Sequence, residues 1–189
     1  MFETTGPGEY SIVFKNRLSE DLTVTLSLHT FEDKAEEYGV ADMGYSTSAT
    51  FFDMDEDGDL DLYVGNQMPS SRYLKKQSAG VNYAYTDNLY RNDSNGKFTA
   101  VTEAAGVKNF AAALSTTASD LNGDGLVDIY VANDYEEPDL FYVNRGDGTF
   151  ANVAHVSLKH MSNFSMGVDL ADFNNDGIDG IYNFVITIR

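Results

Sequence analysis

Three short segments of this chain carry carboxylate and amide side chains at alternate positions around a glycine. They read FFDMDEDGDLDLYVGN at 51–66, SDLNGDGLVDIYVAND at 119–134 and ADFNNDGIDGIYNFV at 171–185. Side chains at alternate positions of a tight loop can converge on one point, and Ca²⁺ takes six to eight oxygen ligands at flexible distances. Gly58, Gly125 and Gly177 stand where the chain must turn sharply, in a conformation that other residues resist. The pattern predicts three Ca²⁺-binding loops.

The predicted metal ligands are the oxygen-bearing positions of each loop, together with the backbone carbonyl of the residue after the glycine. They are Asp53, Asp55, Asp57, Asp59 and Asp61 in the first loop, Asp120, Asn122, Asp124, Leu126 and Asp128 in the second, and Asp172, Asn174, Asp176, Ile178 and Asp179 in the third. The third loop has Gly180 where the closing Asp belongs, with Asp179 one position early. Because fewer anionic ligands weaken Ca²⁺ binding, we expect two well-formed sites and a weaker third.

An EF-hand and an ordinary surface turn are the alternatives to this interpretation. An EF-hand requires a bidentate Glu at loop position 12, which here holds Val64, Val131 and Asn183. It also requires flanking helices, whereas these flanks favour strands. Asp/Gly-rich turns are common on surfaces, but three copies in one strand context favour a metal site. The chain has no Cys and three His, so nothing supports a transition metal.

The elements that must position these loops are expected to be short strands. Small and β-compatible residues precede each loop at 46–52, 111–119 and 164–171, and apolar residues follow the first two loops at 60–64 and 127–131. A third strand begins at 89–90 or 140–143 and ends at Asn95-Gly96 or Asp147-Gly148, which are typical of tight hairpins. Segments 99–102 and 151–156 supply a fourth strand. The sequence therefore predicts an all-β protein built of four-stranded antiparallel units.

These units recur along the chain. The loops start 67 and 52 residues apart, a spacing that suits four-stranded propeller blades. The predicted repeats cover about 31–86, 87–138 and 139–189. Residues 1–30 are expected to form a separate hairpin from strands at 10–14 and 22–28. Segment 31–38 (FEDKAEEY) could form a helical turn, but its alignment with FTAVTEAAGV at 98–107 argues against a helix.

The charge of the chain is concentrated in the loops. The formal net charge is −18, from 30 acidic and 12 basic residues, and eleven Asp residues lie in the three loops. A phosphate backbone would be repelled by this field, so nucleic acid is an unfavourable partner. The sequence contains no run of 18 apolar residues, so it does not predict a membrane-spanning segment. No secretory signal is visible at the start.

The three loops, the recurring LYxN strand, the GDGTF-type turn and the trailing AGV resemble FG-GAP/VCBS repeats, in particular those that precede the ASPIC/UnbV domain in cartilage-acidic-protein-like proteins. The resemblance covers about residues 31 to 182. It implies integrin-α-type propeller blades, Ca²⁺ in each Asp-rich loop, an extracellular, periplasmic or cell-surface location, and recognition or adhesion. Three repeats are fewer than the four to eight blades of a closed propeller, so we expect a fragment that joins further blades or self-associates.

A protein or glycan ligand is expected at the end of the strands opposite the metal loops. The connection at 67–85 is 15 residues longer in the first repeat than its counterpart in the second. It holds a basic and aromatic cluster of Arg72, Tyr73, Lys75, Lys76, Tyr83 and Tyr85. Tyr and Arg are common interface anchors, but a solvated insertion is the simpler interpretation.

No nucleophile motif or phosphate-binding glycine loop appears, and the carboxylate spacing is explained by metal ligation. The sequence therefore favours a non-catalytic Ca²⁺-binding module for recognition or adhesion. Two alternatives stay open at this point, namely a propeller portion of a larger polysaccharide-active enzyme and a structural spacer made rigid by Ca²⁺.

Overall fold

The protein was analysed as a computed structural model, which describes residues 2–6, 9–14, 22–27, 32–67, 86–134, 138–162 and 164–185. The chain divides into two compact units, Met1–Lys34 and Ala35–Arg189. The first unit contains an antiparallel sheet in the order β1 (Phe2–Gly6), β2 (Glu9–Phe14) and β3 (Leu22–Ser27). The β2–β3 pair confirms the expected hairpin. Strand β1 was not predicted, because FETTG has one large apolar residue and no clear alternation.

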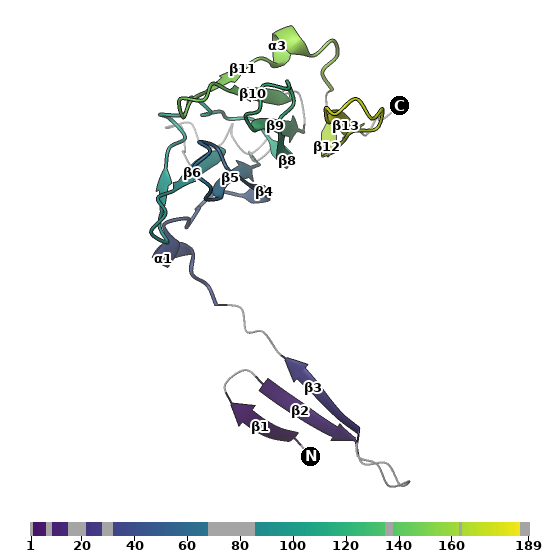
Figure 1. Ribbon diagram of the computed structural model, residues 1–189. Helices are drawn as coiled ribbons and strands as arrows, with labels where there is room; N and C mark the ends of the chain where they lie inside the picture. The colour runs from purple at the N-terminus through teal and green to yellow at the C-terminus, as the bar shows by residue number, and fades with distance from the viewer. Residues whose placement is uncertain are drawn as a thin grey trace, which may run out of the picture. The chain divides into compact units, whose positions relative to one another are not determined.

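The second unit contains two four-stranded antiparallel sheets, which confirm the predicted all-β units (Figure 1). The first sheet has the order β4 (Ser46–Phe52), β5 (Asp61–Asn66), β6 (Asn88–Asn92) and β7 (Phe98–Ala100). The second has β8 (Ala113–Ser119), β9 (Asp128–Asn133), β10 (Leu140–Asn144) and β11 (Phe150–Asn152). Within each sheet, chain order and spatial order agree.

The third repeat contributes a pair of strands within the described residues, β12 (Ser165–Ala171) and β13 (Gly180–Val185). The sequence analysis named a strand after the first two loops only, so β13 was not predicted. Its register against β12 repeats that of β5 on β4 and of β9 on β8, including the shift near the start of the first strand. The alternation in GIYNFV is sufficient for a strand despite the altered loop end.

Two helical turns correct the prediction for the segments that follow the fourth strands. Residues Ala35–Tyr38 form α1, and Ala154–Ser157 form α3, where the sequence had been assigned to strand up to 156. The aligned segment after β7 also turns, with Val107 N–H donating to Thr102 O just as Val40 N–H donates to Ala35 O. The three segments are therefore equivalent, as their alignment indicated. Because all three form a turn, the alignment did not argue against a helix at 31–38.

The hydrophobic core lies between successive sheets. One cluster joins the first and second sheets and includes Phe52, Tyr63, Ile129, Val131 and Phe150. A second cluster joins the second sheet to the third repeat through Tyr130, Phe141, Val168 and Ile181. The first strands of the repeats line up, with β8 between β4 and β12 (Figure 1). This packing sets the metal loops of successive repeats beside one another.

Within the described part of the chain, no helix has the length and apolar character needed to span a membrane.

Candidate metal centre

The three acidic segments form the same nine-residue loop between the first and second strand of each repeat. We call them loop one (residues 53–61), loop two (120–128) and loop three (172–180). The sixth position is a glycine with φ of +90°, +91° and +87° at Gly58, Gly125 and Gly177. This left-handed conformation is open to glycine and costs other residues about 1–2 kcal/mol. The prediction that the glycine makes the turn is confirmed.

The fourth position of the loop is also left-handed, which the sequence analysis did not anticipate. Glu56, Gly123 and Asn175 have φ of +60°, +79° and +57°. Gly and Asn at this position in two of the loops were the available signal, because both residues adopt the left-handed region readily. Two left-handed residues in one loop curl the chain around its own first Asp.

The first Asp of each loop organises the backbone. Asp53 Oδ2 accepts the N–H of Gly58 at 3.0 Å. Asp120 Oδ2 accepts the N–H of Gly125 at 2.8 Å, and Asp172 Oδ2 that of Gly177 at 2.9 Å. The residue after the glycine donates its N–H to the fifth-position Asp in all three loops. These bonds hold the loops in shape, and in loop one they leave Asp53 Oδ1 without a hydrogen-bond partner.

Loop one brings three carboxylates together. Oxygen atoms of Asp53, Asp55 and Asp61 all lie within 4.8 Å of one another, the only such convergence of three His, Cys, Asp or Glu residues among the described residues. Asp53 Oδ1 is buried and has no hydrogen-bond partner. A buried carboxylate oxygen without a partner is costly, and a cation removes that cost. The residues of loop one therefore fit a divalent cation with hard oxygen ligands.

The closing Asp of the first two loops ties the loop to the third strand. Asp61 is 1 % exposed, and its oxygens accept the N–H groups of Met54 at 2.8 Å and Asn92 at 2.7 Å. Burial raises the pKa of Asp61, the two N–H donors oppose that shift, and the neighbouring Asp55 and Asp57 add to it. A bound cation would offset the electrostatic cost of these neighbouring carboxylates.

Loop two repeats this arrangement with one amide in place of a carboxylate. Asp128 accepts the N–H groups of Leu121 at 3.2 Å and Asn144 at 2.9 Å, and burial raises its pKa. The pKa of Asp120 is lowered, chiefly by the N–H of Gly125. Asn122 Nδ2 donates to Asp124 Oδ2 at 2.9 Å. Loop two is therefore satisfied by its own hydrogen bonds to a greater extent than loop one.

Loop three keeps the first part of the ligand set and differs at its end. Asn174 Nδ2 donates to Asp176 Oδ2 at 2.7 Å, as in loop two. Gly180 occupies the position of the closing Asp. A Cβ added to Gly180 would lie 2.7 Å from Cε1 of Phe173, so the Phe173 ring fills the space that a side chain at this position would need. Asp179 Oδ2 accepts a hydrogen bond from Ser119 Oγ of the preceding repeat at 2.7 Å. The structure thus directs Asp179 toward the neighbouring sheet rather than into a closed ligand shell.

The sequence analysis missed a second polar cluster, at the end of the strands opposite the loops. Asp87 has no exposed surface and accepts hydrogen bonds from Tyr63 Oη at 2.8 Å and Asn66 N at 2.7 Å. Asp139 accepts the equivalent bonds from Tyr130 Oη at 2.8 Å and Asn133 N at 2.9 Å. The signal was the Asp that opens both DNLYRN and DLFYVN. These carboxylates brace the second strand against the third.

Burial raises the pKa of Asp87 to about 6, although its three hydrogen-bond donors act to lower that pKa. The third donor is Asn109 Nδ2, at 2.9 Å. Asp87 is therefore a structural group whose charge depends on pH close to neutrality. Its counterpart Asp139 is bonded in addition by Ser162, Ser165 and Asn183.

The acidic loop and the turn between the third and fourth strands share one end of each of the first two sheets. Asn92 Nδ2, just before the β6–β7 turn, donates to Leu60 O of loop one at 3.2 Å. Asn144 Nδ2 makes the equivalent bond to Val127 O at 3.2 Å. The basic and aromatic cluster predicted at the other end, from Arg72 to Tyr85, lies outside the described residues.

Comparison with known protein families agrees with this geometry. A sequence model of the FG-GAP-like repeat matches residues 79–131 and again residues 120–182, together more than half of the chain. This chain belongs to the FG-GAP-like repeat family. The matched segments contain loops two and three of this FG-GAP-like chain. Loop one precedes them, and its shared backbone geometry extends the repeat to residue 53. Among curated proteins, no relative matches the chain.

Proposed function

We propose that this FG-GAP-like chain is a Ca²⁺-binding, non-catalytic module of β-propeller type that serves recognition or adhesion outside the cytoplasm. The observation that carries the proposal is the convergence of Asp53, Asp55 and Asp61 around a buried carboxylate oxygen with no partner. In loop one the further ligands would be Asp57 and the backbone carbonyl of Asp59. In loop two they would be Asp120, Asn122, Asp124 and Asp128 with the carbonyl of Leu126.

Ca²⁺ is favoured over Mg²⁺ because the ligand set is made of protein oxygens on a flexible loop. Mg²⁺ requires near-ideal octahedral geometry and keeps several of its waters, so it is rarely held in such a cage. Ca²⁺ tolerates seven or eight ligands at variable distance. The bound ion would supply positive charge that neutralises the loop carboxylates, and the residues of the chain would hold the loop in register with the following strand.

An extracytoplasmic role is supported by the chemistry of the loops. Modules that work outside cells bind Ca²⁺ with dissociation constants of about 10⁻⁴ to 10⁻³ M, an affinity that exposed, amide-containing loops can provide. Asp55 and Asp57 are exposed, and loops two and three each have one Asn in the set. The likeness to repeats that precede the ASPIC/UnbV domain belongs to this proposal. A protein or glycan ligand is the proposed partner.

Thermal unfolding with and without Ca²⁺ tests the proposal. An ion that binds the native state alone at a hundredfold excess over its dissociation constant stabilises that state by about 2.7 kcal/mol per site. For a chain of this size we expect a rise in Tm of about 5 to 10 °C. Equimolar Mg²⁺ should give a much smaller rise, and chelator should abolish it. Equal melting temperatures in Ca²⁺ and in chelator would refute the metal function.

The recognition part of the proposal needs a separate experiment. Binding to glycan arrays and to extracellular-matrix proteins should be measured in Ca²⁺, with the Arg72→Ala/Lys75→Ala/Lys76→Ala variant as the comparison. We expect the variant to keep its Ca²⁺-dependent melting and to lose ligand binding. A chain that is stabilised by Ca²⁺ but whose ligand profile does not change in the variant would instead be a rigid spacer.

A further inference from the structure

Successive repeats interlock through the apolar residue that follows the first Asp of each loop. In loop one this residue is Met54, which is 3 % exposed and lies in the same buried cluster as Phe150 of the next repeat. Its carbonyl oxygen accepts a hydrogen bond from Asn144 Nδ2 at 2.9 Å. In loop two the residue is Leu121, which packs in the core shared with the third repeat. Each loop therefore inserts one side chain into the repeat that follows it.

In loop three the equivalent residue is Phe173, and among the described residues no following repeat receives it. Its side chain is 65 % exposed. Its ring meets that of Tyr182 edge-on, with centroids 5.3 Å apart. Phe184, on the same strand as Tyr182, is 64 % exposed. We call these three aromatic residues the trailing face. They present a large apolar surface at the open side of the third repeat.

At the other end of the row, the place that receives such a side chain is open. A cavity of about 270 Å³ is lined by Tyr38, Asp59, Asn92, Ser94, Gly96 and Phe98 of the first repeat. In the second repeat the positions of Tyr38, Asn92 and Phe98 are held by Ala105, Asn144 and Phe150, which lie around Met54. We call the cavity the leading socket. The leading socket of the first repeat is equivalent in position to the site in the second repeat that Met54 occupies.

The first strands at the two open sides also match in size. Between the first and second repeats, a Cβ on Gly65 would lie 2.8 Å from Thr116 Cγ2, so glycine faces a bulky residue. By position in the repeat, Phe184 corresponds to Gly65, and Ala49 corresponds to Thr116. At a junction between the trailing face and the leading side, Phe184 would therefore face the exposed Ala49. In the first junction the small residue is on the preceding repeat and the large one on the following repeat, and in the second junction the order is reversed. Each junction therefore pairs one large with one small residue, as close packing requires.

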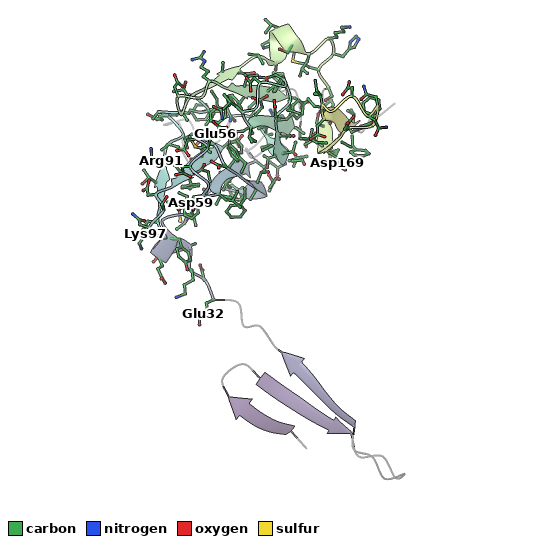
Figure 2. All side chains as sticks on the ribbon, in the orientation of Figure 1. Glu32, Glu56, Asp59, Arg91, Lys97 and Asp169 are labelled. Carbon is green, nitrogen blue, oxygen red and sulfur yellow. The ribbon has the colours of Figure 1, made fainter. Side chains whose placement is uncertain are left out.

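We propose that the trailing face of one copy binds the leading socket of a second copy, with Phe173 inserted between Tyr38 and Phe98. The occupant is a second copy because the junction reproduces the packing that already joins the repeats within one chain. Figure 2 shows Asp59, at the socket, and Asp169, on β12, at opposite sides of the row of sheets, so a single chain cannot bring the two surfaces together. The cavity is incomplete without the partner's aromatic ring.

Such a head-to-tail contact closes into a ring or continues into a filament. Two copies with three repeats each make six repeats, which falls within the four to eight blades of closed propellers. A closed dimer is therefore the expected assembly. Of the socket residues only Asp59 is a proposed metal ligand, and Phe173 lies in loop three, between the proposed ligands Asp172 and Asn174.

The first experiment measures the mass of the full chain in solution by analytical ultracentrifugation between 1 and 100 µM. We expect a dimer whose dissociation constant rises at least tenfold in Phe173→Ser. The matched control is Val156→Ser, which removes an apolar side chain of 84 % exposure on α3. A wild-type chain that stays monomeric throughout the range overturns the proposal, as does equal weakening by both substitutions.

The second experiment traps the junction by disulfide formation. Within the chain, Thr50 Oγ1 and Thr116 Oγ1 lie 2.8 Å apart, and the equivalent pair across two copies is Asp169 and Ala49. The natural chain has no cysteine, so Asp169→Cys and Ala49→Cys introduce the only thiols. Both positions are exposed, so the variants should fold.

Mixing the two single variants under mild oxidation should give a two-chain product several-fold above that from either variant alone. Ala49→Cys mixed with Val156→Cys is the control. If the leading socket is instead covered by residues 1–31 of its own chain, no mixed product will exceed the control, and the proposal is wrong.

Discussion

At the scale of single residues, the first Asp of loop one performs two tasks. One oxygen of Asp53 holds the N–H of Gly58, and the other is buried without a hydrogen-bond partner. The first task needs an acceptor, which an amide also provides. The second needs a negative charge, because an amide oxygen attracts a divalent cation less strongly than a carboxylate does. A substitution that keeps the hydrogen-bond acceptor and removes the negative charge therefore tests the cation-binding task without removing the bond to Gly58.

Asp53→Asn should therefore leave the fold intact and weaken Ca²⁺ binding at loop one by at least tenfold, or about 1.4 kcal/mol. Without Ca²⁺ the variant should be as stable as the natural chain or more so, since one charge leaves a crowded carboxylate cluster. Isothermal titration calorimetry would show the loss of the tightest site. Glu36→Gln, which removes one exposed charge on α1, is the control. Similar affinities for both variants would contradict the assignment.

The buried Asp87 makes stability depend on pH. Its pKa is about 6 in the folded chain against an ordinary value of 3.8. The folded state therefore holds a proton that the unfolded state has released between these values, and stability falls as pH rises through this window. The stabilising contribution of this group falls by about 2 kcal/mol between pH 4 and pH 6.5.

Asp87→Asn should flatten this part of the pH profile, as measured by urea unfolding in chelator. The difference between the natural chain and the variant should persist in 0.5 M salt, because a buried group is screened little. Parallel profiles for the two proteins would show that Asp87 does not titrate in this range.

Residue types at fixed spacing were enough to predict the geometry of the loops, because each loop is shaped by a hydrogen bond between an Asp and a Gly five residues apart in sequence. Asp87 and Asp139 escaped prediction because their tyrosine partners lie 24 and 9 residues away along the chain. The hydrogen bond to Asp179 was not predictable for a similar reason, since the hydroxyl that donates it belongs to Ser119 of another repeat.

At the scale of elements, the turn after each fourth strand packs against the next repeat. Gly39 has φ of +81°, and a Cβ there would lie 2.7 Å from the backbone oxygen of Phe98. Gly106 is similar, with φ of +75° and 3.3 Å to the oxygen of Phe150. Gly58 has φ of +90° but nothing within 4 Å of such a Cβ. A substitution at Gly58 therefore measures the free-energy cost of the left-handed backbone alone. A substitution at Gly39 measures that cost together with the cost of a steric clash.

Gly58→Ala should cost about 1 kcal/mol in the free energy of unfolding, measured in chelator, from backbone strain alone. Gly39→Ala should cost at least about 1 kcal/mol more, since β7 must move away from α1. Guanidinium unfolding measures both values. Equal losses would mean that the contact with Phe98 is easily relaxed.

Strand existence was predictable from alternation and turn residues, but the ends of the fourth strands were not. The segments at 99–102 and 151–156 have β-compatible composition, and their last residues turn because Gly106 and Asn152 provide the backbone and capping bonds for a turn. Local propensity alone does not distinguish these outcomes.

At the scale of the whole molecule, hydroxyl groups join the first strands of adjacent repeats. Thr116 Oγ1 lies 3.0 Å from Ser48 Oγ and 2.8 Å from Thr50 Oγ1, and its carbonyl accepts Thr50 Oγ1 at 2.9 Å. No backbone ladder links β4 to β8, so these bonds and the apolar core hold the two sheets in register. Such long-range pairs could not be read from the sequence, which shows only a run of Ser, Thr and Ala.

Thr116→Val should lower the free energy of unfolding by about 1 kcal/mol, because it keeps the side-chain shape and removes the hydrogen-bonding hydroxyl. Thr117→Val, at the next residue and on the other side of β8, is the matched control. Thermal or urea unfolding of both variants in chelator provides the comparison. A larger loss from the control would place the coupling elsewhere.

The turn that ends one repeat also has a consequence for where a repeat begins. Phe150 N–H donates to Ala105 O, and Val107 is fully buried in the core beside the second sheet. Residues 101–107 thus complete the fold of the second sheet, whereas β6 and β7, which the sequence pattern counts with the second repeat, belong to the first sheet. A cut at the predicted boundary between residues 86 and 87 would separate β5 from β6, whereas a cut directly after β7 keeps both four-stranded sheets whole and leaves Val107 with the sheet that it covers. The boundary for exchange or shuffling of these repeats therefore lies after β7, later in the chain than the sequence pattern predicts.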